Sequence, residues 1–146
     1  MRIRNWSLGY LFGYIFTTIG VRSFYRKYKV VGKENIPKGK PILFAGNHQN
    51  AFLEGAILGY VTRSPIYFLA RSDIFKKKAA SFILTSLNAL PIYRERDGAD
   101  YRDKNEEVFE QFYDLLSKNR RIVIFPEGNH GKHQQLRSLK KGIFRI

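Results

Sequence analysis

The amino-acid sequence predicts an α/β domain, with a mostly parallel sheet flanked by helices and an N-terminal membrane-associated helix before it. Short apolar runs alternate with helix-length segments along the chain, which is the pattern of βαβ units. A length of 146 residues suits one domain, since domains typically contain about 100–150 residues. We therefore expect residues 1–30 to form an N-terminal amphipathic, membrane-associated helical segment and residues 31–146 to form the α/β domain.

The N-terminal helix is predicted from an uncharged stretch, residues 5–21, that is rich in apolar and aromatic side chains. A membrane-spanning helix needs about 20 apolar residues, and Gly9 and Gly13 interrupt this shorter stretch. Lys and Arg flank it on both sides, at Arg2, Arg4, Arg22, Arg26, Lys27 and Lys29. Because such cations bind anionic lipid, we expect a helix that lies in the headgroup region. An ordinary buried first helix is the alternative.

The remaining elements follow from the positions of the apolar residues. Strands are predicted at residues 41–45, 66–70, 90–93 and 121–125, with a weaker one at 28–31. Helices are predicted at residues 51–61, 74–88 and 104–118, the last from apolar side chains that recur with helical spacing. Asp103 and Glu106 are predicted to form a capping pair at the start of this last helix.

The composition excludes several classes of protein. The chain has no cysteine, which rules out a disulfide framework, a thiolate zinc site, an iron–sulfur cluster and a cysteine nucleophile. Its 44% of hydrophobic residues exclude a disordered tail. The 26 Lys and Arg against 12 Asp and Glu give a net charge of +14. This charge predicts an anionic partner: nucleic acid, a phosphorylated substrate or an acidic membrane surface.

Conspicuous polar residues follow three of the predicted strands. Asn47 and His48 follow the first main strand, Arg94 follows the third, and Glu127 with Gly128 follows the fourth. The carboxyl ends of parallel strands lie at one edge of a sheet, and ligands bind there in open α/β folds. We therefore expect one site at that edge, where Glu127 binds loop amides or a substrate hydroxyl. A plain turn punctuated by Pro and Gly is the alternative for this last segment.

His48 is a candidate general base, because imidazole side chains exchange protons near neutral pH. Glu54 lies six residues later and is predicted to hydrogen-bond the ring, fix its tautomer and stabilise the imidazolium, as the carboxylate of a serine triad does. A structural role for the pair is the alternative. No Ser or Cys nucleophile lies beside the pair in the sequence, so the predicted reaction uses a hydroxyl that the substrate brings.

Cationic side chains are candidate phosphate ligands. A guanidinium group at the edge of the sheet, such as that of Arg94, can bind a phosphate through two parallel hydrogen bonds. Arg137 is a further candidate near the C-terminus, whereas Lys residues 76–78 are predicted to be a solvated or headgroup-facing helix end. No metal site is predicted, because His130 and His133 lack further ligands at a suitable spacing.

Three motifs, NHQN-AFLE, LPIYRERDG and FPEG followed by LRSLKKG, together resemble those of the lysophospholipid acyltransferase family, which includes 1-acylglycerol-3-phosphate O-acyltransferase. The resemblance runs from about Lys33 to the last residue. It implies an acyltransferase α/β domain in which His48 deprotonates the acceptor hydroxyl and Glu54 replaces the family's Asp, one residue further along. It also implies that Arg94 recognises the acceptor phosphate.

The third motif departs from the family pattern. Glu127 and Gly128 match it, whereas Asn129 and His130 stand where the family commonly has Thr and Arg. We expect Arg137, Lys140 or His130 to take the place of the missing Arg. The implied substrate-binding residues are Asn47, Arg94, Glu127, Gly128, His130 and Arg137. A fourth motif of the family is absent, so we expect the chain to be incomplete at its C-terminus.

The resemblance implies transfer of a fatty acyl group from acyl-CoA or acyl-ACP to the hydroxyl of lysophosphatidic acid or a similar glycerolipid acceptor. This reaction requires no cofactor besides the acyl carrier as co-substrate, and no metal. The implied location is a membrane surface, the cytoplasmic face of the inner membrane, with no nucleic acid as partner. Two alternatives remain: a basic nucleic-acid-binding module, and a catalytically inactive lipid-binding relative.

Overall fold

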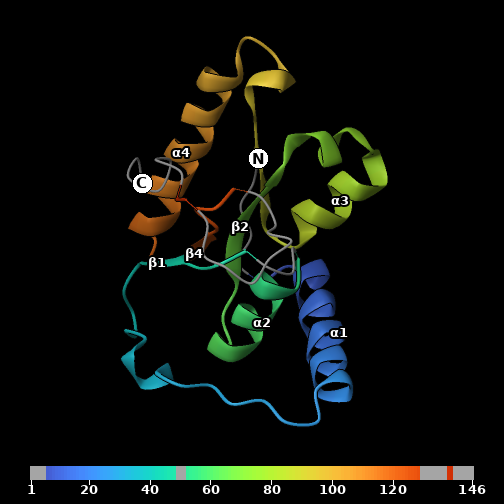
Figure 1. The fold of residues 1–146 in the computed structure, drawn as a ribbon, viewed down its shortest axis with the longest axis vertical. Helices are drawn as coiled ribbons and strands as arrows, with labels where there is room; N and C mark the ends of the chain where they lie inside the picture. Colours follow the sequence, from blue (N-terminus) through green and yellow to red (C-terminus); the bar gives the residue numbers. More distant parts are fainter. Residues whose placement is uncertain (1–5, 49–51, 129–137, 140–146) are drawn as a thin grey trace.

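Figure 1 shows the computed structural model of the chain, which describes residues 6–48, 52–128 and 138–139. The helices are α1 (Leu8–Phe24), α2 (Phe52–Thr62), α3 (Lys78–Ser86) and α4 (Tyr101–Ser117), and the strands are β1 (Ile42–Ala45), β2 (Ile66–Arg71), β3 (Ala89–Ile92) and β4 (Arg121–Ile124). The described residues also form three 3-10 helices: η1 (Lys33–Asn35), η2 (Ser72–Lys76) and η3 (Glu95–Asp97). All four main strands were predicted to within one residue at each end.

The four strands form one sheet in the order β1-β4-β2-β3, and all of the pairings are parallel. β4 pairs with β1 from Ile42 opposite Arg121 to Ala45 opposite Ile124. The predicted fold class, α/β with a parallel sheet flanked by helices, is therefore confirmed. Because β4 lies between β1 and β2, its carboxyl end lies in the middle of the sheet.

The chain direction determines which face each helix covers. The connections from β1 to β2 and from β2 to β3 run one way across the sheet, and the connection from β3 to β4 runs back. Since such crossovers are right-handed, α2 and α3 belong on one face and α4 on the other (Figure 1). The side chains of β4 agree with this arrangement, because a Cβ atom added to Gly55 of α2 would lie 4.0 Å from Cγ1 of Val123, while Ile122 and Ile124 join the core beneath α4.

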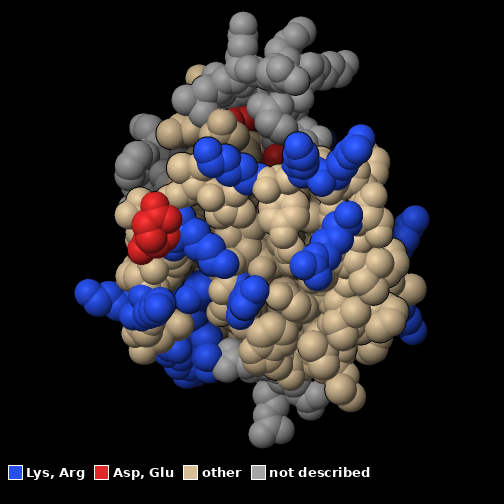
Figure 2. Space-filling model, turned by 90° about the horizontal axis from the view of Figure 1, so that it is seen from below, with Lys and Arg blue, Asp and Glu red and all other residues tan. Residues whose placement is uncertain are grey.

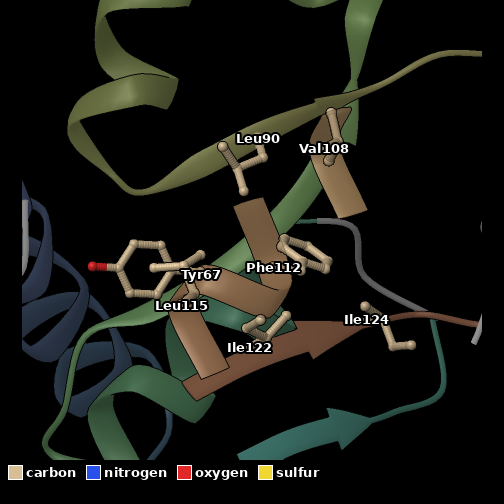
Figure 3. Close-up of a cluster of buried hydrophobic side chains, with 7 residues drawn as sticks. All are labelled: Tyr67, Leu90, Val108, Phe112, Leu115, Ile122 and Ile124. Atoms are coloured by element: carbon tan, nitrogen blue, oxygen red, sulfur yellow. The ribbon is translucent and has the colours of Figure 1, made fainter. Parts of the chain in front are cut away.

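The main core lies between α4 and the sheet, as Figure 3 shows. Val108, Phe112 and Leu115 recur along α4 with the predicted helical spacing, and each is at most 3% exposed. They pack against side chains of β2, β3 and β4, namely Tyr67, Leu90, Ile122 and Ile124. This core supports the sheet. The polar residues that follow the strands lie at the carboxyl edge of the same sheet.

α1 is docked on one side and exposed on the other. The hydroxyl of Tyr10 accepts a hydrogen bond of 2.9 Å from the backbone N–H of Ile66 in β2, and burial raises the pKa of this hydroxyl. Ser7 caps the helix and donates a hydrogen bond of 3.1 Å to the carbonyl of Ser86 in α3. The opposite side carries exposed apolar residues, among them Leu8, Phe12 and Phe16.

A strongly basic segment follows α1 and runs along the bottom of the molecule in Figure 1. Figure 2, which views the molecule from below, shows that Lys and Arg spread over this face and far outnumber Asp and Glu. Arg26, Lys27 and Lys29 are exposed in this segment. Among the helices that the structure describes, none combines the length and the hydropathy needed to cross a bilayer.

The predicted strand at residues 28–31 is wrong, since the structure has no strand there. Val30 and Val31 are exposed, and Tyr28 packs its ring edge-on against Tyr60 of α2. Side chains of high β-propensity favour a strand only where a neighbouring strand supports it. This segment lies away from the sheet (Figure 1).

Two predicted helix starts also differ from the structure. The segment predicted as one helix from residue 74 consists of η2 followed by α3. The capping pair of Asp103 and Glu106 is wrong, because α4 begins at Tyr101 and Asp103 lies within its first turn. Gly98 ends η3 with a φ of 142°, a conformation that favours glycine, and the helix starts soon after it.

Candidate functional site

Polar side chains from all four strands gather at the carboxyl edge of the sheet. His48 follows β1, Glu127 follows β4, Asp73 follows β2 and Arg94 follows β3. The strand order places Glu127 between His48 and the other two. Strands lie about 4.8 Å apart, so the ends of β1 and β3 are separated by roughly 14 Å. The edge therefore has an imidazole at one end and a guanidinium group at the other.

His48 and Glu54 form the predicted hydrogen bond. Nδ1 of His48 lies 2.8 Å from Oε2 of Glu54, and the two side chains are 16% and 21% exposed. Glu54 stands in the first turn of α2, where the helix dipole favours a carboxylate. The pair is thus partly shielded from solvent.

An aromatic ring stacks on one face of the His48 imidazole. The ring of Phe125 lies 4.2 Å from that of His48 between centroids, with an interplanar angle of 10°. Gly46 continues the β1–β4 pairing through a hydrogen bond of 3.1 Å from its N–H to the carbonyl of Ile124. Among the described residues, the Glu54 carboxylate and the Phe125 ring thus both contact the imidazole of His48. Asn47, beside it, is exposed.

Glu127 is buried at the centre of the edge, with an exposure of 3%. Within the described part of the chain, neither of its carboxylate oxygens has a hydrogen-bond partner. Gly128 follows with a φ of 70°, and its N–H donates a bond of 3.0 Å to the carbonyl of Phe125. The positive φ favours glycine at position 128, and Glu127 lies in the same turn. A buried polar group without a partner costs about 1–3 kcal/mol.

Arg94 lies between two carboxylates, an arrangement that the sequence did not predict. Its Nη2 atom is 3.4 Å from Oδ2 of Asp73, and its Nε atom is 3.5 Å from Oδ2 of Asp97. Asp73 is also paired with the guanidinium group of Arg71. The backbone N–H of Arg94 and the hydroxyl of Ser72 lower the pKa of Asp97 to about 2. The carboxylates are therefore ionised at neutral pH and offset the charge of Arg94.

Two of the predicted substrate-binding residues, His130 and Arg137, lie outside the described residues. The structure brings His48 and Glu54 into contact and puts Arg94 and Glu127 on the same edge. The roles of all these residues in binding and catalysis stay predictions. In the described ranges, no three His, Asp or Glu side chains are grouped so that they could hold a metal ion.

Comparison with known proteins identifies the class. Residues 27–146 match the family model described as Acyltransferase. The match covers most of the chain, including every strand of the sheet and the pair of His48 and Glu54. The chain therefore belongs to the acyltransferase family.

Two curated relatives indicate a branch of that family. The chain is 28% identical over 121 residues to a 1-acyl-sn-glycerol-3-phosphate acyltransferase of Chlamydomonas reinhardtii, which covers 82% of this chain and 34% of the relative. It is 28% identical over 119 residues to the 1-acyl-sn-glycerol-3-phosphate acyltransferase of Borreliella burgdorferi, which covers 80% of this chain and 44% of the relative. The chain thus spans less than half the length of each. No solved structure matches it significantly.

Proposed function

We propose that this chain transfers a fatty acyl group from a thioester carrier, acyl-CoA or acyl carrier protein, to the hydroxyl of lysophosphatidic acid or a similar glycerolipid. The single observation that carries this proposal is the contact of 2.8 Å between His48 and Glu54 at the carboxyl edge of the sheet. Family membership supports the reaction class. The names of the two relatives support the acceptor class.

The geometry supports a general-base mechanism. Glu54 engages Nδ1 of His48, so Nε2 takes the proton of the acceptor hydroxyl as the hydroxyl oxygen attacks the thioester carbonyl carbon. The resulting imidazolium is stabilised by the Glu54 carboxylate. Collapse of the tetrahedral intermediate breaks the C–S bond, and the proton on His48 passes to the leaving sulfur. The products are the new ester and the free thiol of the carrier.

Arg94 binds the acceptor phosphate in this proposal. The phosphate and the acylated hydroxyl of such an acceptor are separate groups of one molecule, and the edge of the sheet has separate cationic and basic ends to match them. Glu127, buried between these ends, binds a hydroxyl of the glycerol. The reaction needs no cofactor, because the thioester donor is already activated.

The acceptor and the donor's acyl chain are lipids, and we propose that the chain works at a membrane surface, on the cytoplasmic face of the inner membrane. α1 and α3 pack against each other and supply exposed apolar side chains that fit a bilayer interface: Leu8, Phe12, Phe16, Phe24, Phe82 and Ile83. Cations lie at the start of α3, at Lys76, Lys77 and Lys78, and the sequence contains no acidic residue before Glu34. Apolar side chains beside cations favour anionic lipid surfaces.

The reaction is tested by incubating the full chain with lysophosphatidic acid and either palmitoyl-CoA or palmitoyl acyl carrier protein. We expect phosphatidic acid by mass spectrometry and thiol release that depends on the acceptor. Thiol release without an acceptor requirement, or no product with either donor, would contradict the proposal. Tight, salt-sensitive binding of single-stranded nucleic acid without vesicle binding would instead favour a nucleic-acid-binding protein.

A further inference from the structure

Two side chains fix the backbone at the end of β3, just where Arg94 leaves the sheet. The side-chain amide of Asn105, in α4, accepts a hydrogen bond of 2.9 Å from the N–H of Tyr93 and donates one of 2.8 Å to its carbonyl. Oδ2 of Asp97 accepts a hydrogen bond of 2.8 Å from the N–H of Arg94. The strand end is therefore held from two sides, one residue apart.

Asp97 also contacts the Arg94 side chain and is itself held in place. Its Oδ2 atom lies 3.5 Å from Nε of Arg94 and accepts a hydrogen bond of 2.8 Å from the hydroxyl of Ser72. Ser72 is 7% exposed and the Asp97 side chain 10%. One shielded oxygen thus connects the end of β2, through Ser72, with the backbone and the side chain of Arg94.

Asp73, the other carboxylate beside Arg94, is held differently. Its contacts are with the guanidinium groups of Arg71 and Arg94, and its side chain is 33% exposed. A side chain near the surface that is held by long, flexible partners exchanges its contacts more easily than one held by a backbone N–H. A phosphate that approaches Arg94 can therefore displace Asp73 and leave Asp97 in place.

We propose that Asp97, held by Ser72, is a positioning residue that aims the Arg94 guanidinium at the phosphate of the acceptor, and that this phosphate takes the place of Asp73. The inference rests on the proposed function. It separates two neighbouring carboxylates by role: Asp97 orients Arg94, and Asp73 is its exchangeable counter-ion. Asp97 acts through Arg94 and does not touch the reacting atoms.

A structural role for Asp97 makes different predictions. If it only stabilised η3, its removal would lower the melting temperature and impair every acceptor alike. A positioning role acts on phosphate-bearing acceptors alone and disappears when Arg94 is absent. The distinction is measurable as an affinity, without a turnover assay.

The test measures binding of a short-chain lysophosphatidic acid, below its micelle concentration, to the full chain by isothermal titration. Asp97→Ala should raise Kd by about tenfold or more, because it removes both the ion pair of 3.5 Å to Nε of Arg94 and the hydrogen bond that the carboxylate accepts from the Arg94 backbone N–H. Asp97→Asn keeps an oxygen acceptor and should stay within about threefold of wild type. Ser72→Ala should weaken binding in the same direction. Asp114→Ala is the matched control and should leave Kd unchanged. It removes an exposed carboxylate of α4 that lies 2.7 Å from Nζ of Lys118.

Arg94→Ala completes the experiment. Adding Asp97→Ala to Arg94→Ala should cause no further loss of affinity, and the matching monoacylglycerol, which lacks the phosphate, should bind wild type and Asp97→Ala equally. If Arg94→Ala binds lysophosphatidic acid normally, the phosphate role in the proposed function is wrong and the inference fails with it. If Arg94→Ala loses affinity while Asp97→Ala and Ser72→Ala do not, or if Asp97→Ala weakens monoacylglycerol equally, only the inference is wrong.

Discussion

Glu54 reaches His48 although five residues separate them in the sequence. In the related motif an Asp follows the His after four residues, so this chain combines one more residue with one more methylene group. The observed distance of 2.8 Å shows that the longer side chain makes the contact from the first turn of α2. The longer side chain of Glu54 therefore compensates for the longer spacing from His48.

Shortening this carboxylate should slow the reaction. Glu54→Asp withdraws the carboxylate by one C–C bond, about 1.5 Å, which is enough to break the hydrogen bond to His48. We expect kcat to fall about tenfold or more with the acceptor KM unchanged, because the base loses its orienting partner. Steady-state kinetics provide the measurement, with Glu110→Asp on the exposed face of α4 as the control. An unchanged kcat would show that the contact is structural.

Asp97 should make the stability of the chain depend on pH. The pKa of Asp97 is lowered from 3.8 to about 2 in the folded chain, first by the backbone N–H of Arg94 and then by Ser72. A carboxyl with a lowered folded pKa stabilises the fold above its unfolded pKa, and this stabilisation is lost as pH falls toward the folded pKa. The Tm difference between wild type and Asp97→Asn should therefore be full near neutral pH and shrink as the pH falls from about 4 to about 2. Thermal melts across this range test it, and a constant difference would contradict it.

The candidate site could be predicted in part from single residues. His48, Arg94 and Glu127 are conspicuous because each closely follows an apolar strand, and the resemblance implied roles for His48 and Arg94. Ser72 and Asp97 could not be predicted to meet, since they are 25 residues apart. Their contact exists only because β2 and β3 are neighbours in the sheet.

Among the elements, α1 and α3 show how small residues permit close packing. A Cβ atom added to Gly9 would lie 2.7 Å from Cβ of Ser86, which is closer than such atoms approach. A Cβ atom added to Gly20, on the same helix, would meet nothing within 4 Å. The sequence suggested that glycines weaken this segment as a spanning helix. The structure shows that Gly9 is needed for docking against α3.

These two glycines form a matched pair of substitutions. Gly9→Ala should destabilise the chain by about 1–3 kcal/mol, because the docked helices must move apart. Gly20→Ala should stabilise it by roughly 0.5–1 kcal/mol, because alanine has the higher helix propensity and no neighbour to displace. Urea titration followed by circular dichroism measures both. A loss of stability in Gly20→Ala equal to that in Gly9→Ala would contradict the docked arrangement of α1.

Strands and helices differed in how well the sequence predicted them. The four main strands are continuous apolar runs with polar ends, as expected for a sheet covered on both faces, and their bounds were nearly correct. The segment at residues 28–31 has similar composition but no neighbouring strand, so composition alone was misleading. The starts of α3 and α4 depend on η2 and η3, whose short turns carry no apolar periodicity.

For the whole molecule, the strand order is what the sequence could not provide. β4 lies between β1 and β2, which puts Glu127 between the imidazole end and the guanidinium end of the edge. α4 covers one face of the sheet. α1, α2 and α3 lie on the opposite face, where α1 packs against α2 and α3. The exposed apolar surface of the molecule is consequently concentrated over α1 and α3.

Membrane binding should depend on this surface. Replacing both Phe12 and Phe16 by Ser should lower the partition coefficient for phosphatidylglycerol vesicles, measured by flotation, by about 100-fold or more, because each buried aromatic side chain contributes about 1.5–3 kcal/mol. Tyr113→Ser, which removes an exposed aromatic ring from α4, is the matched control. Equal flotation of the Phe variant and wild type would rule out α1 as the membrane contact.

The most direct test of the account is acyl transfer by His48→Ala, with wild type assayed in parallel. The imidazole is the base that makes the acceptor hydroxyl nucleophilic, so kcat should fall by about 100-fold or more, while the melting temperature and vesicle flotation stay close to those of wild type. A folded His48→Ala variant that forms phosphatidic acid at a rate within about twofold of wild type would contradict the proposed function, since general-base catalysis contributes far more than that.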